Sequence, residues 1–197
     1  MDFFKNKYRI ASARAPFWDY SRNASYFITI CTKNNKPWLG QIENGEMQLS
    51  ELGWIAFNCW MEIPQHFPFV VLDAFVIMPD HVHGIIKIDK HEPVETQNVE
   101  TQNVETQDVE TQDLASLLVT EHLTIKPKNK FGPQSRNLAS VVRGFKIGVN
   151  KKSRQLHPDF SWQARYHDRI IRNWLEHLKI TRYIENNPKN WDGHFNN

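Results

Sequence analysis

The sequence predicts an α+β domain of the ferredoxin-like or RRM-like type, in which helices pack on one face of an antiparallel sheet. Segments rich in β-branched and aromatic residues alternate with segments whose apolar residues recur at helical spacing. Their order is strand, hairpin, helix, two strands, helix, strand, helix, which is typical of two-layer α+β folds. The chain has 197 residues, of which 40% are hydrophobic, enough to bury a core.

Local signals justify the individual elements. Asn44-Gly45 favours a tight hairpin turn, Ser50 is a suitable helix N-cap, and Pro188 ends the last helix. The stretch FVVLDAFVIM, residues 69–78, is almost wholly apolar, which is typical of a strand covered on both faces. The predicted strands are residues 25–32, 39–49 (as a hairpin), 69–78, 81–88 and 165–172, and the predicted helices are residues 50–65, 135–154 and 173–188.

An acidic repeat interrupts this pattern. Residues 94–113 read VETQNVETQNVETQDVETQD, a five-residue unit in four copies with one Val per unit. Such a segment cannot build a core, so we expect a disordered, low-complexity insert within a single domain that spans residues 1–197.

The net charge of +2 conceals a basic domain. The repeat carries six acidic residues and no base, so the rest of the chain holds 24 Lys and Arg against 16 Asp and Glu. Residues 126–172 alone hold twelve Lys and Arg against two Asp. This balance favours a polyanionic partner, most often nucleic acid, and the alternative is a basic face that serves only solubility.

Cysteine usage and hydropathy favour a cytoplasmic protein with no membrane partner. Cys31 and Cys59 form no CxxC pair, which suits a reducing compartment, and we expect both as small core residues. The N-terminal stretch lacks the apolar core of a signal peptide, and no run approaches the 18 apolar residues of a membrane span.

The stretch MPDHVHG, residues 78–84, places two histidines two positions apart at the start of a strand. Successive strand side chains point to opposite faces, so Val82 and Ile86 face a core while His81 and His83 lie side by side on the other surface. The pair is weak evidence alone, and two partly exposed strand residues are the alternative. The HExxH and deaminase patterns of zinc hydrolases are absent.

Tyr183 and Asn187 lie four residues apart near the end of the last predicted helix, so they share one face. At 100° per residue they lie roughly 140–180° from an apolar stripe and need not belong to the core. The alternatives are an ordinary packed aromatic for Tyr183 and a helix C-cap before proline for Asn187. The stripe consists of Ile171, Trp174, Leu175 and Leu178.

These side chains together could perform phosphodiester chemistry. Two imidazoles and an amide oxygen can hold a divalent cation that polarises a phosphodiester oxygen. A nearby tyrosine can attack the phosphorus and become a covalent carrier, provided that the site helps to remove the proton of this weak acid. The phosphotyrosine link conserves the energy of the broken bond, so the strand can be rejoined, whereas attack by water would only cut.

Two motifs carry a family resemblance. MPDHVHG resembles the HUH motif, in which a bulky apolar residue, here Val82, separates two histidines. RYIENNP, residues 182–188, is similar to the YIxxNP helix of the REP-associated tyrosine transposases of the single-tyrosine HUH transposase superfamily. The resemblance covers nearly the whole chain except the acidic repeat. Further similar stretches are YFITICTKN (26–34), GEMQLSELG (45–53), FGPQSRNLASVVRGFK (131–146) and WQARYHDRIIRN (162–173).

The resemblance implies a bacterial enzyme that nicks and rejoins single-stranded DNA at REP-like hairpin repeats, as a monomer or a homodimer. His81 and His83, on a central strand, would be metal ligands, with Asn187 as the third ligand. Tyr183, on the C-terminal helix, would form a 5′-phosphotyrosine with the DNA. The metal would be magnesium or manganese, although ligand softness alone would not choose magnesium for two imidazoles.

Other residues are compatible with DNA binding, although each is individually more typical of a surface or packing position. Trp162, Tyr166 and His167 could stack on unpaired bases. The residues that could contact DNA phosphates are Arg136, Arg143, Lys146, Lys151, Lys152, Arg154, Arg165 and Arg169.

Two other functions stay open at this point. One is a domesticated protein of the same fold that binds DNA hairpins without turnover, and the other is a metal-dependent nuclease that uses water. The complete set of two histidines, tyrosine and asparagine favours the transposase-like enzyme, because a binding protein has no physical need for all four.

Overall fold

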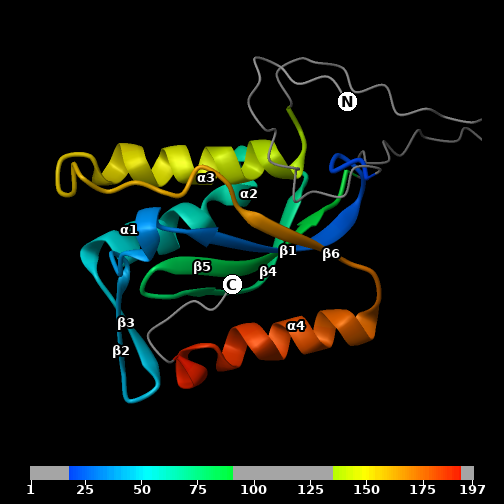
Figure 1. Ribbon diagram of the computed structural model, residues 1–197. Helices are drawn as coiled ribbons and strands as arrows, with labels where there is room; N and C mark the ends of the chain where they lie inside the picture. Colours follow the sequence, from blue (N-terminus) through cyan, green and yellow to red (C-terminus); the bar gives the residue numbers. More distant parts are fainter. Residues whose placement is uncertain (1–17, 91–134, 192–197) are drawn as a thin grey trace, which may run out of the picture. The chain divides into compact units, whose positions relative to one another are not determined.

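The computed structural model describes residues 18–90 and 135–191, which belong to one compact unit (Figure 1). The acidic repeat at residues 94–113 lies outside the described residues, so its predicted disorder and its place within a single domain stay predictions. Within the described part, the predicted strands and helices are all present, with bounds that shift by a few residues.

A four-stranded antiparallel sheet with the order β4-β5-β1-β6 forms the centre of the fold. This order and the intervening helices are those of the ferredoxin-like fold, which confirms the predicted class. The strands are β1 (Ala24–Cys31), β4 (Val70–Ile77), β5 (His81–Ile88) and β6 (His167–Ile171). A separate hairpin consists of β2 (Gly40–Glu43) and β3 (Glu46–Leu49), and its turn residues Asn44 and Gly45 both have positive φ.

The helices begin at the side-chain caps that their sequences provide. Ser50 accepts a hydrogen bond from the Gly53 amide, and Asn137 and Ser140 form a reciprocal capping box. The predicted helix 50–65 is divided at Glu62, because Pro64 has no amide hydrogen to continue the first helix. The helices are α1 (Glu51–Met61), α2 (Ile63–His66), α3 (Leu138–Ser153) and α4 (Trp174–Asn186), and the 3₁₀ turns are η2 (Lys33–Asn35) and η3 (Pro188–Asn190).

The main core lies between the sheet and helices α1 to α3. Val82 and Ile86 of β5 belong to this core together with Trp60 of α1 and Phe145 of α3, and Cys31 and Cys59 are buried as predicted. Gly84 lies beneath Trp60, where an added Cβ would come within 2.3 Å of the indole ring. The glycine of HVHG therefore admits the largest buried side chain of the core.

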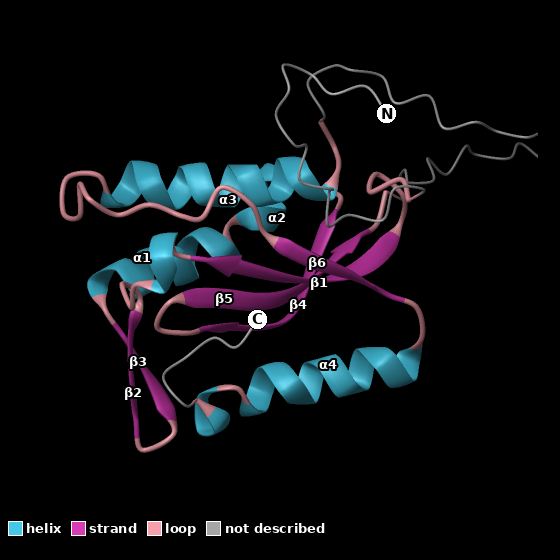
Figure 2. Ribbon diagram, viewed as in Figure 1, coloured by secondary structure: helices cyan, strands magenta, loops and turns pink. Residues whose placement is uncertain are grey.

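Helix α4 packs on the opposite face of the sheet (Figure 2). Helices on one face were predicted, and this description fits α1, α2 and α3 only. His81 and His83 are among the residues of β5 that point away from the main core, and on that face Tyr183 of α4 contacts His83. The sheet therefore has one face that builds the core and another that carries the candidate site.

The strand predicted to be covered on both faces, β4, is contacted by α1 and α2 on one face and by α4 on the other, but it lies at an edge of the sheet and is buried only in part. β4 has one sheet neighbour, β5, and Val71 is half exposed. Its pairing with β5 is interrupted by a bulge between Leu72 and Phe75. The interior strand β5 is buried along nearly its whole length, because β4 and β1 flank it, Trp60 of α1 packs over Gly84, and α4 lies on the opposite face.

Candidate active site

The two histidines of MPDHVHG form a buried pair on the sheet. The ring centroids of His81 and His83 are 4.4 Å apart, and each side chain is only 1% exposed. The prediction that both rings occupy the non-core face of β5 is confirmed, because their neighbours there come from β1 and α4. The alternative of two partly exposed surface residues does not fit this burial.

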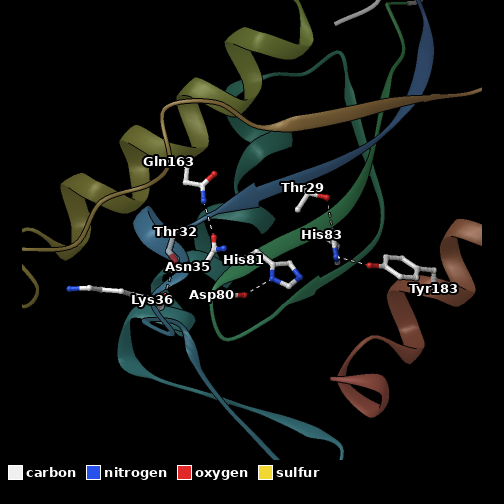
Figure 3. Close-up of polar contacts among 9 residues, drawn as sticks. All are labelled: Thr29, Thr32, Asn35, Lys36, Asp80, His81, His83, Gln163 and Tyr183. Atoms are coloured by element: carbon white, nitrogen blue, oxygen red, sulfur yellow. Dashed lines mark hydrogen bonds and ion pairs between the residues drawn. The ribbon is translucent and has the colours of Figure 1, made fainter. Parts of the chain in front are cut away.

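Asp80 orients the first histidine. Its Oδ1 lies 2.5 Å from Nδ1 of His81, and the carboxyl group is buried (Figure 3). A carboxylate accepts hydrogen bonds, so Nδ1 of His81 is the donor and Nε2 carries the lone pair. This carboxylate–histidine arrangement is the one that commonly fixes the tautomer of a metal-binding imidazole.

His83 is held from both sides by hydroxyl groups. Oγ1 of Thr29, the partner of His83 across the β1–β5 ladder, lies 2.9 Å from Nδ1, and Oη of Tyr183 lies 3.3 Å from Nε2 (Figure 3). Burial, and secondarily the neighbouring His81, lower the pKa of His83 from 6.5 to about 2. The ring is therefore neutral at physiological pH, which is the form that ligates metals.

Tyr183 reaches the histidine pair from α4. Its ring lies 5.3 Å from that of His83 and meets Phe27 of β1 edge-on at 6.0 Å. The side chain is 49% exposed, so it is no ordinary core aromatic. The sequence analysis placed Tyr183 opposite an apolar stripe that includes Trp174 and Leu175. This stripe was wrong in part, because both of these side chains are exposed and α4 buries Ile184 instead.

Asn187 lies at the C-cap of α4, as the helix-cap alternative predicts, and is half-buried. Tyr183 precedes it by four residues and contacts His83, and Trp191 follows it by four residues and lies 5.7 Å from the ring of His81. Asn187 therefore lies between two residues that face the histidines. Within residues 18–90 and 135–191, no hydrogen bond joins its side chain to either ring.

A hydrogen bond and an ion pair attach the first turns of α4 to opposite edges of the sheet. Nε2 of His177 lies 2.7 Å from Oδ2 of Asp73 on β4, and Nη2 of Arg169 on β6 lies 2.6 Å from Oε1 of Glu176. Because β4 and β6 are the two edge strands, these pairs hold the helix across the sheet. The position of Tyr183 depends on this attachment.

The predicted DNA-contacting residues are dispersed over the fold. Six of the eight lie in or next to α3, on the far side of the sheet from the histidines, and Arg169 on β6 is opposite Phe27 on the site face. Arg143, Lys151, Arg154 and Arg165 are exposed, and Arg136 is exposed and lies over the Phe69 ring.

Lys146 and Lys152 are engaged within the protein. Nζ of Lys146 donates hydrogen bonds to the carbonyl oxygens of Gln163 at 2.7 Å and Arg165 at 2.9 Å, and its burial lowers its pKa to about 8. Lys152 pairs with Glu62 at 2.6 Å. Trp162, which the sequence suggested for base stacking, is buried against Phe145 instead, while His167 is exposed.

Sequence reasoning missed five residues that contribute to the site or to its support. Asp80 precedes His81 directly, so its place in the motif was a usable signal. Thr29 is 54 residues from His83 and becomes its neighbour only through strand register. The pairing of Asp73 with His177 and the approach of Trp191 to His81 likewise depend on how α4 docks, which no local pattern encodes.

Comparison with known proteins places the chain in a family. No family model matches it. A Haemophilus influenzae protein described only as uncharacterized is 37% identical over 182 residues, which cover 92% of this chain and 89% of that protein. The chain belongs to the same family as this protein. The description of this relative names no activity, so membership of the family does not by itself assign a function to the chain.

A solved structure extends this comparison to the fold. A REP-associated tyrosine transposase, solved bound to a REP hairpin, aligns with a TM-score of 0.55 and 15% identity, over 91% of this chain and 73% of that one. The chain therefore has the fold of that transposase, which matches the resemblance drawn from the HUH and tyrosine motifs.

The described residues also bear on cofactors and membranes. No group of three or more His, Cys, Asp or Glu side chains in residues 18–90 and 135–191 is arranged to hold a metal ion. None of the helices in the described part combines the length and apolarity of a membrane span.

Proposed function

We propose that the chain is a tyrosine transposase-like enzyme that nicks and rejoins single-stranded DNA at hairpin repeats. The observation that carries the proposal is the contact between the Tyr183 hydroxyl and Nε2 of a buried, neutral His83. A candidate nucleophile thus lies beside a histidine pair whose Nδ1 atoms are already engaged by Asp80 and Thr29. The fold shared with a REP-associated tyrosine transposase supports the same reaction.

The residues of the site fit a divalent metal. The two rings of His81 and His83 are adjacent, and Asp80 and Thr29 bind their Nδ1 atoms, so both Nε2 atoms are directed away from these anchors. The amide oxygen of Asn187 would be the third ligand, and magnesium or manganese the metal. When bound, such an ion would draw charge from a phosphodiester oxygen and make the phosphorus more electrophilic.

Tyr183 would carry out the covalent step. Its oxygen forms a bond to phosphorus while the bond from phosphorus to the 3′ oxygen breaks, which leaves a 5′-phosphotyrosine and a free 3′-hydroxyl. His83 cannot bind a metal and accept the phenolic proton through the same Nε2 atom. The proton therefore passes to water, which the half-exposed side chain of Tyr183 can reach. The reverse reaction rejoins the strand.

The basic residues would hold DNA outside the reacting centre. Arg169 lies on the site face of the sheet and is the best placed of them to contact the strand near Tyr183. Exposed residues of α3, such as Arg143 and Lys151, lie behind the sheet and would bind phosphates at a distance from the cleaved bond.

The deciding experiment compares the protein with its Tyr183→Phe variant on labelled single-stranded hairpin repeats from the flanks of its own gene. Reactions contain manganese or a chelator, and denaturing gels reveal covalent adducts. We expect a manganese-dependent adduct that the variant does not form. Cleavage without an adduct in both proteins would identify a water-using nuclease, and binding without either product would identify a hairpin-binding protein.

A further inference from the structure

Trp191 lies at the opposite end of the histidine pair from Tyr183. Its ring centroid is 5.7 Å from that of His81, with an angle of 44° between the planes. The side chain is half-buried, so part of the indole remains accessible to a ligand. Tyr183 at His83 and Trp191 at His81 thus flank the pair, and both come from the segment formed by α4 and η3.

Two elements hold Trp191 in this position. Pro188 begins the 3₁₀ turn η3, and the amide of Trp191 donates to the Pro188 carbonyl at 3.4 Å. The turn is supported from outside by the tip of the β2–β3 hairpin, where a Cβ on Gly45 would lie 3.7 Å from the Cα of Lys189. The η3 turn and the hairpin tip therefore fix the backbone next to Trp191 and hold its indole beside His81.

We propose that Trp191 stacks on an unpaired nucleobase next to the phosphate that Tyr183 attacks. The proposal rests on the proposed function, because a phosphate held at the histidine pair brings its neighbouring base to one end of that pair. Tyr183 occupies the end at His83, and Trp191 offers an accessible aromatic face at the end at His81. Stacking on an aromatic side chain is the usual way in which proteins hold single-stranded bases.

Trp174 provides a matched control on the same helix. It is 70% exposed and lies nine residues before Tyr183, so it is about 180° around α4 from the nucleophile. Its ring stacks on His177 and makes no approach to the histidine pair that is comparable to that of Trp191. Trp174→Ala therefore shows the effect of removing an aromatic side chain from α4 away from the histidines, and Trp191→Ala shows the effect of removing the one beside His81.

The test measures binding in the Tyr183→Phe background, so that it does not depend on cleavage. Hairpins from the gene flanks carry a single-stranded extension in which each nucleotide in turn is replaced by an abasic site. We expect Trp191→Ala to weaken binding of the intact DNA by about 5-fold to 150-fold. Trp191→Phe should retain most of the affinity, and Trp174→Ala should leave it unchanged. For one abasic position, Trp191→Ala should cause no further loss.

Three results would overturn the proposal: unchanged binding by Trp191→Ala, an equal loss on every abasic DNA, or a loss that Trp174→Ala reproduces. Manganese titration of Trp191→Ala by calorimetry gives an independent readout, and a weakened metal affinity would assign the indole to the metal site instead. The adduct assay with the unaltered tyrosine reports separately on the proposed function, so a failure of catalysis and a failure of stacking are told apart.

Discussion

The hydroxyl oxygen of Tyr183 lies 3.3 Å from Nε2 of His83, although a hundred residues separate the two along the chain. Their meeting depends on three placements: the register of β5 against β1, the docking of α4 on the free face of the sheet, and the buried partners of the two imidazoles. Each placement leads to a separate prediction.

The hydrogen bond between Asp73 and His177 should matter more for catalysis than for stability. Asp73→Asn is expected to lower the free energy of unfolding by at most about 1 kcal/mol, because Asp73 is partly exposed. Adduct formation should slow several-fold, since α4 then holds Tyr183 less firmly. A double-mutant cycle with His177→Ala measures the coupling, by urea unfolding and by adduct rate. Strictly additive rate effects would contradict it, and Glu185→Gln, an exposed change on the same helix, serves as control.

Thr29→Val should weaken metal binding through His83. The change removes a buried hydrogen bond to Nδ1, which should cost about 1–3 kcal/mol of stability and about 10- to 100-fold in manganese affinity. Urea unfolding and calorimetric titration measure the two effects. Thr181→Val on α4 is the matched control, because its buried Oγ1 has no hydrogen-bond partner among the described residues. Equal manganese affinities for both variants and the parent would exclude a role for Thr29.

The burial of His83 should appear as a pH dependence of stability. Its pKa is about 2 in the folded protein and 6.5 for an ordinary histidine, so between these values the unfolded chain carries the additional proton. The contribution of the neutral ring is therefore complete above pH 6.5 and is lost as the pH falls below it, with a slope approaching about 1.4 kcal/mol per pH unit. Urea unfolding from pH 7.5 to 4.5 should show this slope in the protein and not in His83→Gln. Parallel curves would refute the assignment.

Lys146 should act as a structural residue. Lys146→Met removes two hydrogen bonds to the carbonyls of Gln163 and Arg165, and we expect a loss of about 1–3 kcal/mol of stability. Lys151→Met, at an exposed position of the same helix, should leave stability unchanged and reduce the salt dependence of DNA binding. Thermal unfolding and binding at several salt concentrations distinguish the two. If Lys146→Met instead left stability unchanged and reduced the salt dependence of DNA binding, Lys146 would be a phosphate contact.

The sequence was sufficient for features that depend on local periodicity. Alternation in HVHGIIKI assigned His81 and His83 to the non-core face, and the caps and turns predicted the order of strands and helices along the chain. The side of the sheet on which α4 docks was not predictable in this way. The apolar residues of α4, such as Leu175, Ile180 and Ile184, lie at different angles around the helix, so the exposed Trp174 and Leu175 gave a misleading stripe.

The partners of the site required long-range information. Thr29 reaches His83 through the β1–β5 register, and Lys146 reaches two carbonyls in a segment that crosses α3. The local sequence around a helix lysine is the same whether its side chain is exposed to solvent or binds the carbonyl groups of a neighbouring loop. The charge of the chain therefore predicted a basic domain correctly, while the role of single basic residues depended on tertiary packing.

α4 has Ile184 as its one buried residue, whereas five residues of α3 are buried in the main core. Release of α4 would therefore expose little apolar surface, and the remaining domain would keep its core. We therefore expect α4 to open as a separate cooperative unit, with an opening free energy below that of global unfolding. Its amide hydrogens should exchange with solvent well before those of α3, so a DNA strand joined to Tyr183 could move with the helix while the domain stays folded.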